Sequence, residues 1–221
     1  MVNEAFVLAG GRSQRMGVDK ARVAWPGRWP MASWVAAVIA RVVPVVRIVR
    51  AAPDPLGFAF PAEPWVRAPG RPIEVIVDDP SLPVHPLRGV AAALRAATTP
   101  LVLIAATDLV DLTEAVVREL VQAGGPAVAC VGGRPALLAV LPADRAPVAE
   151  ALTREGGSFR ELVAGLRPVA VSDALATNQN TPPRDGPLAV LRQRLPRFDE
   201  RIRQGEVARL SARGAVDPSA V

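Results

Sequence analysis

A segment near the start of the chain, LAGGRSQRMGVDK (residues 8–20), combines small residues with positive charge. The small residues at its beginning let backbone N–H groups approach an anion closely, as glycine-rich turns between a strand and a helix do. Arg12, Arg15 and Lys20 then place three cations within one loop. Neither common phosphate pattern is present, since the segment holds no GxxxxGKS/T and no GxGxxG. Its spacing nevertheless favours a phosphate-binding loop over a plain surface turn.

Lys20 is the only lysine among the 26 Lys and Arg residues of the chain. The abundance of Ala, Arg, Gly, Pro and Val is typical of a GC-rich coding bias, which replaces residues wherever their chemistry is not needed. An ammonium is a compact charge that fits between phosphate oxygens, whereas a guanidinium is a planar fork. A lysine that remains despite this bias therefore indicates a site that a planar guanidinium does not fit.

The elements that must position these residues follow from short apolar runs. The runs predict strands at 5–9, 45–51, 73–79, 101–107, 127–131, 136–141 and 169–171. Helices are predicted after Ser33 as a cap, at 88–97, after Thr113 as a cap, and at about 147–155 and 158–166. Continuous Val, Ile and Leu runs between helices argue for a mostly parallel sheet covered on both faces, which is a three-layer α/β/α domain.

Ligands of such sheets bind outside the carboxyl ends of the strands. The glycine loop follows the first predicted strand, Asp78 and Asp79 follow the third, and Asp108 follows the fourth. Because these ends meet at one edge, the sequence predicts a single site there. Asp108 is the strongest candidate there, because a residue that follows a purely apolar strand has little structural reason to be charged. Asp79 and Asp111 are weaker candidates, more typical of turns.

Composition excludes several other classes. The net charge of +5 is spread along the chain without a basic run, and four Trp, five Phe and no Tyr leave few residues for base stacking, so no nucleic-acid partner is expected. The single Cys130 lies in an apolar run and cannot form an internal disulfide, which fits a reducing cytoplasm. No apolar stretch reaches the roughly 18 residues of a membrane span. We expect a soluble, cytoplasmic protein without a membrane partner.

The segment LAGGRSQRMGVDK resembles, position for position, the signature LAGG-x-S-x-R-M-G-x-D-K of the molybdenum cofactor guanylyltransferases. These belong to the MobA-like nucleotidyltransferases, which share a glycosyltransferase-A-like nucleotide-binding fold. The resemblance continues, in the family's order, through VIVDDPSLPVHPLRGVAAAL, LVLIAATDLVDL, RPALLAVL, GGSFRELV and TNQNTPPRD. It spans about 185 residues, so we expect a domain at 1–185 and an Arg-rich C-terminal extension at 186–221, either a docked helix or a partly disordered tail.

The resemblance implies a Mg²⁺-dependent transfer of GMP from GTP to the terminal phosphate of Mo-molybdopterin, with release of pyrophosphate and transient contact with molybdoenzymes. The implied nucleotide-binding residues are Leu8, Ala9, Gly10, Gly11, Lys20, Asp78, Gly89 and Asp108. The implied catalytic residues are Arg15, Lys20 and Asp108, with Asp108 as the metal ligand. Asn178 and Asn180 lie in the segment that the family places near the pterin.

Three departures leave alternatives open. The glycine of the family's GPL segment is His85 here, the family's CD-x-P is TDLVD, and VRAAPD follows the second strand where the family tends to carry an asparagine. His85 either contacts the base or is a structural histidine. One alternative is a relative that uses CTP or a sugar phosphate. The other is a non-catalytic paralogue that binds nucleotide or pterin.

Overall fold

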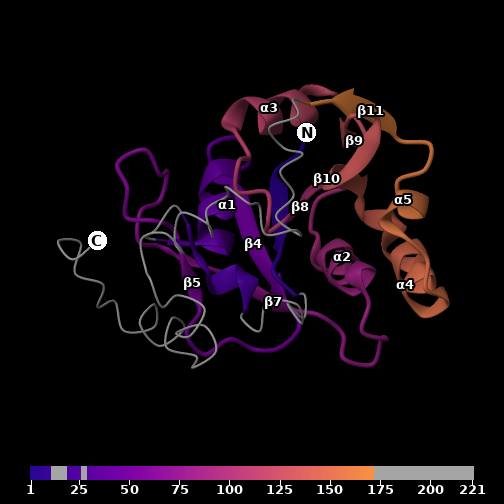
Figure 1. The fold of residues 1–221 in the computed structure, drawn as a ribbon, viewed down its shortest axis with the longest axis horizontal. Coiled ribbons are helices and arrows are strands. Elements are labelled where there is room, and N and C mark those ends of the chain that lie inside the picture. Colours follow the sequence, from indigo (N-terminus) through magenta and orange to yellow (C-terminus); the bar gives the residue numbers. More distant parts are fainter. Residues whose placement is uncertain (11–18, 26–28, 172–221) are drawn as a thin grey trace, which may run out of the picture.

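Seven strands build the central sheet. They are β1 Glu4–Leu8, β4 Val45–Arg50, β7 Val75–Val77, β8 Leu101–Ala106, β9 Ala127–Val131, β10 Arg134–Pro142 and β11 Arg167–Ala170. Their order is β11-β9-β10-β8-β1-β4-β7 (Figure 1). Strands β8, β1, β4 and β7 are parallel neighbours. Strand β10 is antiparallel to β8 and β9, and β11 is parallel to β9. The sheet is therefore mostly parallel, as predicted.

The computed structural model describes residues 1–10, 19–25 and 29–171, with the backbone only for Lys20 and Trp25. The expectations for Gly11, Arg15, Asn178, Asn180 and the extension at 186–221 lie outside the described residues. Among the helices that are described, none is long and apolar enough to cross a membrane.

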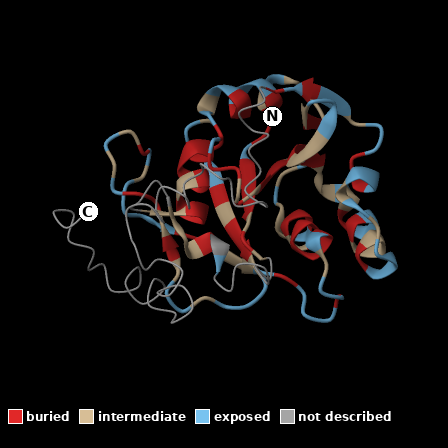
Figure 2. Cartoon of the chain, in the orientation of Figure 1, coloured by how far each residue is buried: buried red, intermediate tan, exposed pale blue. Residues whose placement is uncertain are grey.

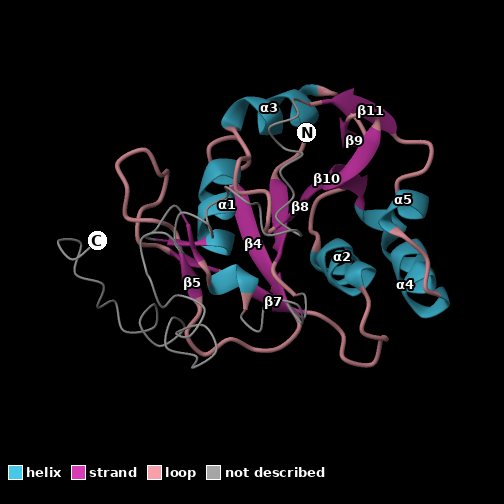
Figure 3. Cartoon of the chain, viewed as in Figure 1, coloured by secondary structure: helices cyan, strands magenta, loops and turns pink. Residues whose placement is uncertain are grey.

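Helices cover both faces of the sheet (Figure 3). Helices α1 Met31–Ala40 and α3 Glu114–Gln122 lie on one face, and α2 Pro86–Ala96, α4 Ala146–Glu155 and α5 Phe159–Leu162 lie on the other. Figure 2 shows the strands and the inner helix faces as the buried part of the molecule. This is the three-layer α/β/α arrangement predicted from the alternation of apolar runs and helical patterns.

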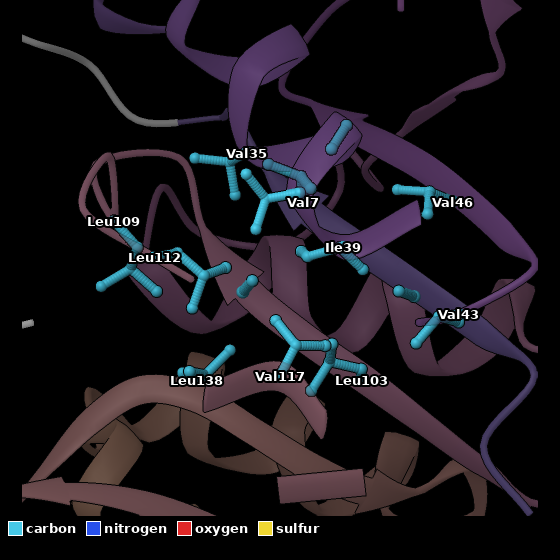
Figure 4. Close-up of a cluster of buried hydrophobic side chains, with 14 of the residues drawn as sticks. Val7, Val35, Ile39, Val43, Val46, Leu103, Leu109, Leu112, Val117 and Leu138 are labelled. Atoms are coloured by element: carbon cyan, nitrogen blue, oxygen red, sulfur yellow. The ribbon is translucent and has the colours of Figure 1, made fainter. Parts of the chain in front are cut away.

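Alternating side chains of β1, an interior strand between β8 and β4, divide the core in two. Ala5 and Val7 of β1 belong to the cluster under α1 and α3, whereas Phe6 belongs to the cluster under α2 and α4. All three are fully buried. Figure 4 shows the first cluster, in which Val7 lies near Ile39 of α1. Both faces of β1 are apolar because a strand covered on each side has no solvated face.

Of the two helix N-caps predicted from the sequence, one is confirmed and one is wrong. Thr113 caps α3 as expected, since its Oγ1 accepts a hydrogen bond from Val116 N at 3.4 Å. The predicted cap at Ser33 is wrong, because Ser33 is buried inside α1 and Pro30 precedes the helix without a side-chain cap. Met31 N instead donates to Val23 O at 2.9 Å, so a tertiary contact satisfies the end of the helix that Ser33 was expected to cap.

Smaller elements occupy two connections. Strand β2 Ala24–Trp25 pairs with β3 Trp29–Pro30, and β5 Phe58–Ala59 pairs with β6 Pro72–Ile73. The second pair lies within the connection between β4 and β7. Two short 3-10 helices, η1 Lys20–Arg22 and η2 Ala143–Arg145, complete the described elements.

Candidate active site

The carboxyl ends of the four parallel strands form one edge, and sheet-like hydrogen bonds continue beyond the last strand residues. Ala9 N donates to Val49 O at 2.8 Å, and Asp78 N donates to Arg50 O at 2.8 Å. The glycine turn, the end of β4 and the first aspartate after β7 are thereby held side by side. The structure thus brings together the strand ends that the sequence places at the predicted site.

Gly10 lies where the backbone of the turn passes very close to the backbone after β4. A Cβ at Gly10 would lie 3.0 Å from Ala51 N and 3.3 Å from the carbonyl carbon of Arg50. Because backbone atoms yield less easily than a flexible side chain, this close approach favours glycine at position 10. The preceding Ala9 is buried, so the small residues of the turn are needed for its close approach to the sheet.

Asp78 is almost entirely buried, with 3% of its surface exposed. Its Oδ2 lies 2.9 Å from Nε of Arg88, a residue of α2 that is itself buried. Its Oδ1 is buried and has no hydrogen-bond partner among the described residues. Since buried polar atoms are nearly always paired, the second carboxylate oxygen is an acceptor that a ligand donor can satisfy.

Sequence reasoning missed Arg88. Its Nη1 also donates to Leu82 O at 3.4 Å, so the same guanidinium links α2 to the connection after β7. The available signal was an arginine directly before Gly89 in an otherwise apolar stretch, RGVAAAL. Gly89 itself packs near β1, since a Cβ there would lie 3.6 Å from Leu8 Cδ2.

Asp108 follows β8 in a turn that is anchored on both sides. Thr107 N donates to Leu8 O at 3.2 Å, and Trp34 Nε1 of α1 donates to Val110 O at 3.2 Å. Leu109, the next residue, is buried in the cluster of Figure 4. Asp108 is half-buried, so its carboxylate stands on a fixed backbone at the edge of the sheet.

The described residues contain no group of three or more His, Cys, Asp and Glu side chains arranged to hold a metal ion. Mg²⁺ takes one or two carboxylates and completes its coordination with substrate phosphates and water, so a magnesium site does not need such a group. Asp108 is a carboxylate of the kind that such a site uses. The neighbouring Thr107 adds a buried Oγ1 without a hydrogen-bond partner among the described residues, which is also a hard oxygen.

His85 has a structural role. Its Nδ1 accepts a hydrogen bond from Leu87 N at 3.2 Å, and its extended backbone makes it the N-cap of α2. The side chain is half-buried. Of the two interpretations from the sequence, this geometry favours the structural histidine. Asp79 is likewise a turn residue, because its Oδ1 accepts from Ser81 N at 2.9 Å.

The opposite edge of the sheet carries the most strongly shifted carboxylate. Burial of Glu4 alone would raise its pKa, but hydrogen bonds from Thr98, Arg47 and Thr99 outweigh that effect and lower the pKa to about 2. Glu4 joins β1 to the start of β8 and to β4. It lies at the amino ends of these strands, away from the glycine turn, so its role is structural.

An α/β/α domain with a glycine turn and aspartates at the carboxyl edge is the architecture of a nucleotide-binding protein. The family model of the MobA-like NTP transferase domain matches residues 5–171, and the chain belongs to this family. The resemblance noted in the sequence is thereby confirmed, as is the fold. A search of curated proteins by sequence found no match.

Many solved structures share the fold. Molybdopterin-guanine dinucleotide biosynthesis protein A from Archaeoglobus fulgidus is 20% identical with a TM-score of 0.57, over 81% of this chain and 93% of that one. A nucleotidyl transferase from Methanothermobacter thermautotroptrophicus is 18% identical with a TM-score of 0.55, over 88% and 97%. Rv0371C from Mycobacterium tuberculosis H37Rv, in complex with manganese, is 14% identical with a TM-score of 0.50, over 76% and 87%. At these identities the likeness establishes the fold alone.

Proposed function

We propose that this chain transfers GMP from GTP to the terminal phosphate of Mo-molybdopterin and releases pyrophosphate. The observation that carries the proposal is the signature LAGGRSQRMGVDK, which begins at the carboxyl end of β1, at the same edge of the sheet as the buried Asp78. The nucleotidyltransferase family of the chain supports the reaction class. The match of the signature to guanylyltransferases supports the base and the acceptor.

The reaction needs positioning and neutralisation of charge more than covalent chemistry. An oxygen of the acceptor phosphate attacks the α-phosphorus of GTP, an O–P bond forms, and the bond to the bridging oxygen breaks with its electrons leaving on pyrophosphate. Two anions must approach each other for this attack. Lys20, with Arg15, would hold the triphosphate, and the backbone at Leu8, Ala9, Gly10 and Gly11 would approach its oxygens.

The carboxylates have separate roles in this proposal. Asp78 Oδ1 would accept a hydrogen bond from the nucleoside, and Gly89 would keep α2 close to β1 beside it. Asp108 would hold Mg²⁺ together with the substrate phosphates. When bound, the ion supplies positive charge to the phosphate oxygens. Asn178 and Asn180 would contact the pterin side, and a molybdoenzyme would receive the product; these two roles rest on the resemblance.

One observation favours a second candidate, a relative that uses CTP. Arg88 already binds Oδ2 of Asp78, so Oδ1 is the carboxylate oxygen without a partner among the described residues. Guanine offers two adjacent donors, N1–H and N2–H₂, whereas cytosine offers the single N4 amine. Two adjacent donors are best matched by two carboxylate oxygens, so a carboxylate with one unengaged oxygen suits the single amine better.

Calorimetric titration with GTP, CTP and ATP, each with and without Mg²⁺, tests the base. Incubation of the preferred nucleotide with Mo-molybdopterin then tests transfer, read as equal amounts of pyrophosphate and dinucleotide product. Binding of GTP alone followed by transfer would support the proposal. Preference for CTP would move the chain to the second candidate, and absence of binding to all three would contradict both and favour a non-catalytic paralogue.

A further inference from the structure

Arg50, the last residue of β4, contacts both ends of the phosphate loop, defined as residues 9–20. Its Nη1 donates to Ala9 O at 2.9 Å, where the loop leaves the sheet. Its Nη1 and Nη2 donate to Oδ1 and Oδ2 of Asp19 at 3.1 and 2.7 Å, where the loop returns. One guanidinium therefore joins two residues ten positions apart in the chain.

The hydrogen bonds of Asp19 extend this restraint to the backbone around Lys20. The Asp19 carboxylate also accepts from Ala21 N at 3.1 Å, and Asp19 O accepts from Arg22 N at 2.9 Å. These bonds fix the first turn of η1, which begins at Lys20. Arg50 holds the same carboxylate beside the end of β4. It therefore restrains the backbone at Asp19, directly before Lys20.

The surroundings of Arg50 hold it in place. Its side chain is 17% exposed, and its Nη2 lies 3.6 Å from Oδ2 of Asp54. Asp54 also pairs with Arg22, whose guanidinium carbon lies 4.4 Å from the centroid of the Phe58 ring. In this cluster the two positive charges of Arg22 and Arg50 balance the two negative charges of Asp19 and Asp54. Arg50 is thus engaged by the carboxylates of Asp19 and Asp54.

We propose that Arg50 is a positioning residue for triphosphate binding, which clamps the two ends of the phosphate loop and so presents Lys20 at the carboxyl edge. This inference rests on the phosphate role proposed for Lys20. Holding Ala9 and Asp19 in place before the ligand arrives lowers the ordering cost of binding. The clamp requires arginine, since a lysine ammonium cannot bind Asp19 in a bidentate manner while also contacting Ala9 O.

The test measures affinity for inorganic tripolyphosphate and for GTP, both with Mg²⁺, in Arg50→Ala, Asp19→Ala and the double variant. Tripolyphosphate has no base, so it reports on the phosphate loop alone. We expect each single variant to weaken the binding of both ligands roughly three- to tenfold, because the groups that the mutation releases must be ordered again when the ligand binds. The double variant should bind as weakly as either single variant and no weaker, because both remove the same clamp. Arg50→Lys should recover only part of the loss.

The matched control is Arg47→Lys, on the same strand. Arg47 pairs with Glu4 and Glu74 near the opposite edge, and its side chain is 16% exposed, close to the value for Arg50. The Arg47→Lys variant should leave both affinities within about twofold of the wild-type values, whereas Arg50→Lys should lower them by more than that. Thermal unfolding checks that each variant is folded, and Asp19→Asn offers a milder change at a more exposed side chain.

Two results would overturn the clamp. One is a folded Arg50→Ala or Asp19→Asn protein that binds tripolyphosphate as tightly as wild type. The other is additive loss in the double variant, which would mean that Arg50 and Asp19 act separately. If wild type itself binds neither tripolyphosphate nor any nucleotide, the proposed function fails and the clamp fails with it, a pattern distinct from failure of the variants alone.

Discussion

Nε of Arg88 lies 2.9 Å from Oδ2 of Asp78, and the two side chains are 10% and 2% exposed. Burial of a charge is unfavourable unless an opposite charge and hydrogen bonds compensate it. Here the compensation comes from another element, since Asp78 follows β7 and Arg88 belongs to α2. The pair keeps a carboxylate buried at the carboxyl edge, and its Oδ1 has no hydrogen-bond partner among the described residues.

Removing Arg88 should destabilise the fold. Arg88→Met leaves the Asp78 carboxylate buried without its cation, at a cost of about 3–5 kcal/mol in the free energy of unfolding. Urea denaturation measures this loss. The double variant Arg88→Met, Asp78→Asn removes both charges and should recover part of it. A single variant as stable as wild type would mean that the pair contributes nothing.

Lys20→Ala should weaken nucleotide binding by roughly ten- to a hundredfold, because a charge-assisted contact to the triphosphate is lost. Lys20→Arg keeps the charge but replaces a compact ammonium with a planar fork, so it should restore the affinity only in part. Calorimetric titration with GTP measures both. Unchanged affinity in Lys20→Ala would remove Lys20 from the phosphate site.

Asp108→Asn should reduce metal-dependent turnover roughly a hundredfold or more, because the amide is a poorer ligand for a hard cation than the carboxylate. Asp111→Asn is the control, since Asp111 is exposed and lies in the same turn. Pyrophosphate release at several Mg²⁺ concentrations distinguishes the two. If Asp108→Asn retains full turnover, Asp108 does not hold the metal.

His85→Ala should lower stability by about 0.5–1 kcal/mol through loss of the cap of α2, and should leave the preference among GTP, CTP and ATP unchanged. His85→Asn, which supplies a good capping side chain, should be nearly as stable as wild type. Denaturant melts and competition titrations measure the two properties. A changed base preference in His85→Asn would place His85 in the base pocket after all.

Acid should destabilise the fold through Glu4. Its pKa in the folded protein is about 2, below the ordinary value near 4.5, so the unfolded chain takes up the proton first. The stabilisation, about 3 kcal/mol, is complete above the ordinary pKa and is lost as the pH falls toward 2. Glu4→Gln should be less stable near neutral pH and should lose less stability between pH 5 and pH 2. Melting curves between pH 5 and pH 2 provide the measurement. If Glu4→Gln loses as much stability over this range as wild type does, the prediction is wrong.

Much of the fold follows from local sequence. The apolar runs at 5–9, 45–51 and 101–107 correspond to β1, β4 and β8, because continuous Val, Ile and Leu residues suit strands buried on both faces. The Thr113 cap was also predicted, since helix capping depends on residues near in sequence. These features are short-range, so neighbouring residues suffice to specify them.

The sequence by itself determined the class of fold, and it predicted the edge of the sheet for the site and the small residues that follow β1. Only the tertiary structure decided which charges meet there: Arg50 with Asp19, and Arg88 with Asp78. It also decided that His85 caps α2 and that Ser33 does not cap α1. Ion pairs between distant residues depend on the order of the strands and on which helix covers them, and that order emerges only when the whole sheet buries its apolar faces.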